Sequence, residues 1–231
     1  MESKLDLEAE YDNRTLVPEH VEILPRWEKE AAEFRATHSP ETLRYGAAER
    51  NLVDVFRSAE SAARRAPVVL FIHGGYWRGL SKDMFSHMAG GLLAHGLDVA
   101  MPNYTLCPDI GIPGIGEELK ACCRFLGETE KRPLMMTGHS AGGHLAAFLC
   151  QKSSVESIPV PVIAGLGISG VYDLTAMLHV SMNVDLKLDL KTALAASPYF
   201  AAPEPGISFD AWVGSDESNE FLRQSEDFAS K

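Results

Sequence analysis

The sequence has few basic residues relative to acidic ones. Of its 231 residues, 21 are Lys or Arg and 32 are Asp or Glu, which gives a formal net charge of −11 at pH 7. A protein that binds a nucleic-acid backbone needs a basic face to neutralise phosphates. The acidic balance therefore argues against nucleic acid as a partner, and we interpret the charge as a source of solubility.

Long apolar runs are also absent. No run approaches the ~18 residues of a membrane span. The first residues, Met-Glu-Ser-Lys-Leu-Asp-Leu-Glu, are charged where a secretory signal would be apolar. The chain has only four cysteines, and none has metal-ligand spacing: Cys107, Cys122, Cys123 and Cys150. We therefore expect no membrane partner, a reducing cytoplasmic location, and no metal or organic cofactor.

What is present is the composition of an ordinary globular protein, with 45% hydrophobic and 23% charged residues. Short apolar runs alternate with helical patterns, which predicts an α/β fold with a mostly parallel sheet. We predict one domain over 1–231, with an N-terminal helical arm over 1–40 and an insertion near the site over 172–206. The predicted strands are 52–56, 68–73, 98–104, 134–137, 162–169 and 209–214, and the predicted helices include 84–93, 116–127 and 142–151.

The strongest motif is Gly138-His139-Ser140-Ala141-Gly142. It lies between an apolar strand pattern and an amphipathic helix pattern, which is the context of a nucleophile elbow. A turn this sharp needs glycine on both sides, and it leaves Ser140 at a helix N-terminus, where backbone N–H groups favour developing negative charge. The alternative interpretation is an ordinary turn between a strand and a helix.

A second motif, His73-Gly74-Gly75-Tyr76-Trp77, follows the apolar run 69–72. In an α/β-hydrolase such a loop completes the oxyanion hole. We predict N–H donors at Gly74 and Gly75, with the N–H of Ala141 as the other contributor. Tyr76 and Trp77 are predicted to line the acyl or aryl pocket, with core packing as the alternative.

With these motifs in hand, the chain resembles the bacterial arylformamidase (kynurenine formamidase)-like branch of the α/β-hydrolases. The resemblance extends over nearly the whole chain and includes Tyr11-Asp12-Asn13-Arg14, Tyr45-Gly46, Asn103 to Pro108, Ser169 to Leu174, Ser197-Pro198 and Glu220-Phe221-x-Arg223-Gln224-Ser225. It implies hydrolysis of an aryl formamide such as N-formylkynurenine, or of a small ester, through an acyl-enzyme on Ser140. The expected partner is thus a small aromatic amide or ester; a homodimer is an open alternative.

The triad acid of this fold follows the penultimate strand and precedes the histidine. Asp216 and Glu217 both qualify by position, and the family's spacing favours Glu217, three residues before Glu220-Phe221. The other of the two would be a solvated acid near a helix start. The histidine should come after one further strand, yet no histidine follows His179. The family's last strand, histidine loop and final helix are therefore expected to be missing.

A serine without a neighbouring base is a weak nucleophile. Three explanations are open: a fragment of an ordinary hydrolase, a non-catalytic protein that keeps a ligand-binding pocket, or a surrogate base, for which His179 is the best candidate. Among active enzymes, a general carboxylesterase is the alternative to a formamidase.

Overall fold

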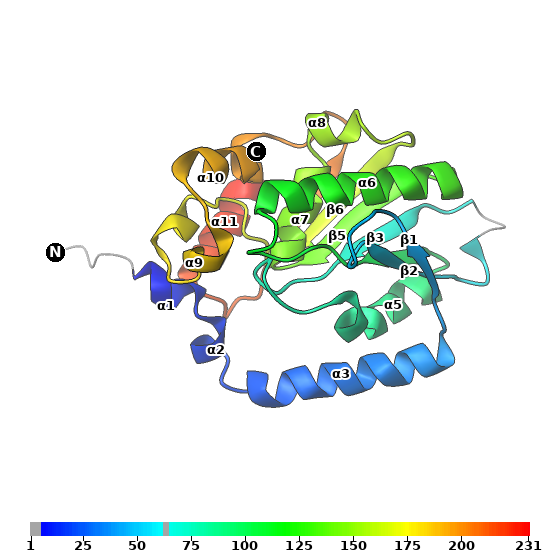
Figure 1. Ribbon diagram of the computed structural model, residues 1–231, viewed down its shortest axis with the longest axis horizontal. Helices are drawn as coiled ribbons and strands as arrows, with labels where there is room; N and C mark the ends of the chain where they lie inside the picture. The colour runs from blue at the N-terminus through cyan, green and yellow to red at the C-terminus, as the bar shows by residue number, and fades with distance from the viewer. Residues whose placement is uncertain (1–5, 62–64) are drawn as a thin grey trace.

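The computed structural model describes residues 6–61 and 65–231 (Figure 1). Its centre is a seven-stranded sheet in the order β1-β2-β4-β3-β5-β6-β7. The pairs β1–β2 and β2–β4 are antiparallel, and all the other pairs are parallel. The strands are β1 (Glu41–Arg44), β2 (Leu52–Phe56), β3 (Val68–Ile72), β4 (Asp98–Pro102), β5 (Leu134–His139), β6 (Val162–Ile168) and β7 (Ser208–Trp212).

Helices cover the two faces of the sheet (Figure 1). One face carries η1 and α5 with the long α3 outside them, and the other carries α6 and α7. The helical segments are α1 (Leu7–Tyr11), α2 (Asn13–Leu16), α3 (His20–Thr37), η1 (Lys82–Met88), α5 (Ala89–Ala94), α6 (Ile112–Glu130), α7 (Ala141–Leu149), α8 (Lys152–Val155), η2 (Ala176–His179), α9 (Asn183–Leu186), α10 (Leu190–Ala196), η3 (Pro198–Phe200) and α11 (Asn219–Ala229).

The alternation of side chains along the central strands builds two cores. On β3, Leu70 and Ile72 pack into the larger core with α6 and α7. Their neighbour Phe71 points to the other face and packs with Phe85 of η1 and Trp27 of α3. Strands buried on both faces contain continuous apolar residues, and this is why 68–72 shows no polar alternation.

The predicted mostly parallel sheet is confirmed, and the six predicted strands are all present. The strand β1 was not predicted, because its four residues are largely exposed and lack an apolar run. The single helix predicted over 84–93 is instead the 3₁₀ segment η1 followed by α5.

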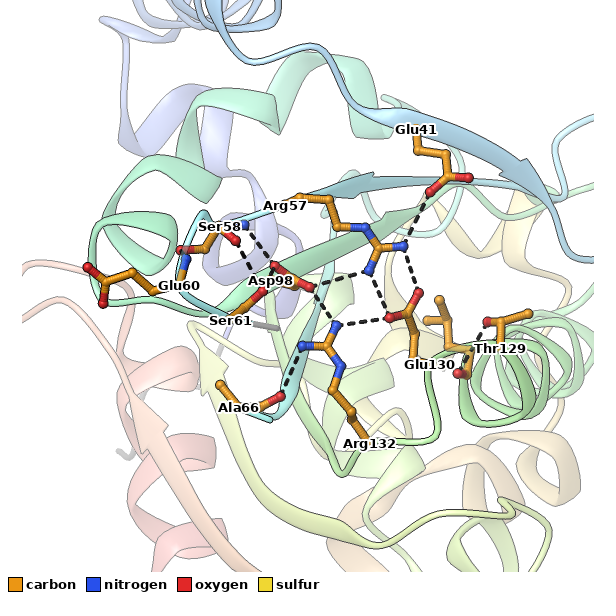
Figure 2. A network of polar contacts seen from close by, with 11 residues as sticks. Glu41, Arg57, Ser58, Glu60, Ser61, Ala66, Asp98, Thr129, Glu130 and Arg132 are labelled. Atoms are coloured by element: carbon orange, nitrogen blue, oxygen red, sulfur yellow. Dashed lines mark hydrogen bonds and ion pairs between the residues drawn. The ribbon is translucent and has the colours of Figure 1, made fainter. Parts of the chain in front are cut away.

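A network of ion pairs lies at the end of the sheet where the parallel strands begin (Figure 2). Asp98, the first residue of β4, is buried and pairs with Arg57 and Arg132. Glu130, at the end of α6, pairs with the same two arginines. Burial alone would raise the pKa of Asp98, but hydrogen bonds from Ser61 and Arg132 hold it below its usual range. The network anchors β4 and α6 at the end opposite the nucleophile turn.

We expect Asp98→Asn to lower the free energy of unfolding by about 3 kcal/mol, because it removes one charge from a buried pair and leaves Arg132 short of a partner. Urea unfolding at pH 7 measures this change. Asp210→Asn, at an exposed position on β7, is the control and should shift the free energy by less than about 0.5 kcal/mol. Equal effects of the two substitutions would contradict the anchoring role.

Candidate active site

Ser140 lies in the turn between β5 and α7. It is the N-cap of α7 and has φ 56° and ψ −118°, a strained conformation for a residue with a side chain. Its backbone N–H donates to the Ile168 carbonyl at the end of β6, at 2.8 Å. The side chain is 6% exposed. The strand, turn and helix that the motif predicts are therefore all present around Ser140.

The turn depends on a very close approach of three backbone segments. A Cβ built on Gly142 would lie 1.9 Å from the Ile72 carbonyl oxygen, and one built on Gly138 would lie 2.4 Å from the Gly142 carbonyl carbon. Neither position has room for a side chain. The absence of both Cβ atoms brings the first turn of α7 against the end of β3, and so brings Ser140 beside the loop that follows β3.

That loop is the His-Gly-Gly-Tyr-Trp segment. A Cβ on Gly74 would lie 2.9 Å from the His139 carbonyl oxygen and 3.3 Å from Ser140 Cβ. Gly75 has φ 115°, which is readily adopted only by glycine. The loop backbone thus lies directly against the nucleophile turn. The predicted oxyanion N–H donors at Gly74 and Gly75 thus belong to a loop that lies beside Ser140.

Tyr76 and Trp77 both have positive φ, 47° and 58°. The Trp77 ring is fully buried, and its Nε1–H donates to Nδ1 of His144 at 3.2 Å. Nε2–H of His144 donates in turn to the Ala196 carbonyl of α10 at 2.8 Å. Trp77 therefore anchors the loop after β3 to α7 and α10, and its contact with a substrate stays a prediction. Tyr76 is partly exposed and donates its hydroxyl to the Tyr11 carbonyl at 2.9 Å.

The two candidate acids have different surroundings. Glu217 Oε1 accepts hydrogen bonds from Ser169 Oγ at 2.6 Å and from the Gly214 N–H at 2.8 Å. Asp216 is exposed and accepts a long hydrogen bond of 3.4 Å from Ser215 Oγ. Ser169 follows β6 with φ 52°. No role was predicted for Ser169, although it lies in one of the segments of the resemblance.

Three histidines near the turn, His73, His139 and His144, have pKa values lowered by their surroundings. Burial lowers the pKa of His73 and of His144 to about 4. It also lowers the pKa of His139, which the neighbouring Glu217 carboxylate raises in part. His73 donates from Nδ1 to the Gly74 carbonyl at 2.7 Å. His179 is exposed at the end of η2. Within the described residues, no hydrogen bond joins a histidine to Ser140 Oγ or to Glu217.

We expect Gly142→Ala to destabilise the fold by about 3 kcal/mol, because its methyl group collides with the Ile72 carbonyl oxygen. Thermal and urea unfolding measure the loss. The control is Gly91→Ala in α5, where a Cβ meets nothing within 4 Å. This substitution should stabilise the protein by up to about 1 kcal/mol, since alanine favours the helix. A tolerated Gly142→Ala would show that the backbones do not approach so closely.

The buried histidines predict a pH dependence of stability. The folded pKa of His73 and that of His144 lie near 4, below the unfolded value near 6.5. Between these values the unfolded chain binds more protons, so stability falls as the pH is lowered. Each histidine contributes a slope of about 1.4 kcal/mol per pH unit. Urea unfolding at pH 5 and pH 6.5 measures it. His144→Gln should remove one such contribution, whereas His95→Gln, at an exposed position, should leave the slope unchanged.

The strand order, the turn around Ser140 and the glycine loop after β3 define the α/β-hydrolase class. The chain belongs to the BD-FAE family, whose model matches residues 53–195. It is 30% identical over 194 residues to the kynurenine formamidase of Salmo salar, a match that covers 80% of this chain and 65% of that enzyme. The chain thus spans about two thirds of the length of that relative.

Solved structures agree with this assignment. A protein of Silicibacter sp. TM1040, provisionally described as a thioesterase, is 31% identical with a TM-score of 0.90; the match covers 98% of this chain and 87% of that one. An esterase/lipase from an uncultured bacterium is 22% identical with a TM-score of 0.71, covering 100% and 78%. The second likeness concerns the fold alone.

Among the residues that the structure describes, no helix is both long and apolar enough to cross a membrane. No group of three or more His, Cys, Asp or Glu side chains in residues 6–61 and 65–231 could hold a metal ion.

Proposed function

We propose that the chain is a serine hydrolase that acts on an aryl formamide or a small carboxylic ester. The observation that carries this proposal is the position of Ser140, in a strained turn at the start of α7 with the Gly74 backbone against it. The kynurenine formamidase relative supports the formamide. A general carboxylesterase is the second candidate, supported by the esterase fold of the structural neighbour.

In the proposed reaction, Ser140 Oγ attacks the carbonyl carbon and loses its proton to a base. The carbonyl π electrons move to oxygen, and the N–H groups of Gly74, Gly75 and Ala141 bind the resulting oxyanion. Collapse of the intermediate expels the aryl amine or alcohol, which takes the proton from the base. Water then attacks the acyl-enzyme in the same way and releases the acid and free Ser140.

We propose Glu217 as the acid, because it follows β7 and is held by two donors that both bind the same oxygen, Oε1. A histidine base would donate one ring nitrogen to this carboxylate and accept the Ser140 proton at the other. None of the eight histidines of the sequence makes either hydrogen bond in the described structure. We therefore propose that rapid turnover needs an imidazole placed between Ser140 and Glu217.

Chemical rescue tests this proposal on the chain as it stands. We expect slow acylation by p-nitrophenyl acetate that free imidazole accelerates at least about tenfold beyond its own reaction with the ester, because imidazole fills the position of the base. Ser140→Ala should abolish the enzyme-dependent rate. Glu217→Gln should remove the rescue, and the matched variant Asp216→Asn should retain it. Rescue lost in Asp216→Asn alone would exchange the roles of the two acids.

The substrate class is tested on the same preparation. Comparison of N-formylkynurenine with p-nitrophenyl butyrate separates a formamidase from a general esterase, because a site shaped for formyl should disfavour the longer acyl group. If Ser140 fails to react with a fluorophosphonate while aromatic amides bind saturably, the chain is a binding protein and the hydrolase proposal is wrong.

A further inference from the structure

The N-terminal segment α1 lies beside α11, although the two are about 210 residues apart in sequence (Figure 1). The Tyr11 side chain is buried, and its ring packs on Phe221 with the centroids 5.7 Å apart. Its hydroxyl donates to Glu220 Oε1 at 3.1 Å and accepts from Gln224 Nε2 at 2.7 Å. The proposed reaction assigns no role to this cluster.

Tyr11 also contacts the loop after β3 through its backbone. We call this loop, residues 73–77, the oxyanion loop after its proposed role. Tyr11 is the last residue of α1, so its carbonyl has no partner inside that helix. It accepts the hydroxyl hydrogen of Tyr76 at 2.9 Å. One residue therefore contacts α11 with its side chain and the loop after β3 with its carbonyl.

The preceding residue strengthens the contact with α11. The first N–H groups of a helix lack partners within the helix. In α11 the Glu220 N–H donates to Glu10 Oε2 at 2.9 Å, and the Phe221 N–H donates to the N-cap Ser218. Ser218 directly follows Glu217 in the sequence. α1 therefore holds the first turn of α11 at Glu220, three residues after the proposed acid.

The Glu220 carboxylate is paired with Arg223 of the same helix. Burial alone would raise the pKa of Glu220, but hydrogen bonds from Arg223, Gln224 and Tyr11 hold it below its usual range. Arg223 donates to both oxygens of the Glu220 carboxylate. Gln224 Oε1 also accepts the Tyr172 N–H at 2.6 Å and the Asp173 N–H at 2.8 Å. The cluster therefore joins α1, α11 and the segment after β6 into one hydrogen-bonded unit.

We propose that α1 acts as a tie: its contacts hold the oxyanion loop and the Glu217 loop, residues 213–218 between β7 and α11, at a fixed separation. Tyr11 is its positioning residue. The inference rests on the proposed function of Ser140 and Glu217. The tie joins a loop that follows β3 to a loop that follows β7, and these strands lie on either side of β5, which leads to Ser140. Because it touches neither the substrate nor the reacting atoms, its loss should lower the rate of acylation and leave substrate binding nearly unchanged.

The test uses Tyr11→Phe, which keeps the ring contact and the backbone carbonyl and removes the hydroxyl. At a temperature well below unfolding, we expect the imidazole-supported acylation rate of the folded protein to fall about tenfold with KM within twofold. The matched control is Tyr172→Phe, since the buried Tyr172 hydroxyl has no hydrogen-bond partner among the described residues. It should leave both constants unchanged.

A double-mutant cycle separates a tie from independent packing. Tyr76→Phe removes the hydrogen bond from the Tyr76 hydroxyl to the Tyr11 carbonyl. The fold decrease in acylation rate of the double variant should therefore be clearly smaller than the product of the fold decreases of Tyr11→Phe and Tyr76→Phe. Effects that multiply would overturn the proposal. So would a Tyr11→Phe protein with a lower melting temperature and an unchanged rate per folded molecule.

Hydrogen exchange keeps the inference testable apart from the activity. In Tyr11→Phe the amides of 74–77 and of 214–220 should exchange faster together, and in Tyr172→Phe neither segment should change. If wild-type Ser140 does not react with a fluorophosphonate, the proposed function fails while this exchange result still decides the tie. Faster exchange in 214–220 alone would show that α1 stabilises α11 but does not stabilise the oxyanion loop.

Discussion

The contact between Gly142 and the Ile72 carbonyl oxygen is the constraint on which the site depends. It joins the start of α7 to the end of β3, and these two elements flank Ser140, the proposed nucleophile, and the loop proposed to bind the oxyanion. A missing Cβ is what permits the approach. The same approach brings the Gly74 backbone against the turn that holds Ser140. The strained φ of Ser140 is held by the elements on either side, as strain at a functional site generally is.

Around this contact the structure uses uncharged polar links. Trp77 donates to His144, and His144 donates to the Ala196 carbonyl, so a neutral imidazole joins the loop, α7 and α10. A charged imidazolium could not accept from the indole, and its burial would be costly. The ion-pair network around Asp98, in contrast, lies where the parallel strands begin and anchors strand ends away from the site.

Much of the site could be read from the sequence because its parts are local. Glycines at 138 and 142 around Ser140, and the glycine pair after the run 69–72, indicate a turn and a loop whose geometry follows from the missing side chains. The strands were predictable for a similar reason, since strands covered on both faces consist of continuous apolar residues. The strand β1 was missed because four exposed residues on an edge carry no such pattern.

The sequence by itself determined the nucleophile turn, the loop beside it and the mostly parallel sheet, since each is specified by residues within a few positions of one another. Only the tertiary structure decided which acid is held and what holds it. Ser169 reaches Glu217 across 48 positions, and Tyr11 reaches Glu220 across 209. Contacts at such separations depend on how strands and helices are placed in three dimensions. No spacing along the chain encodes them.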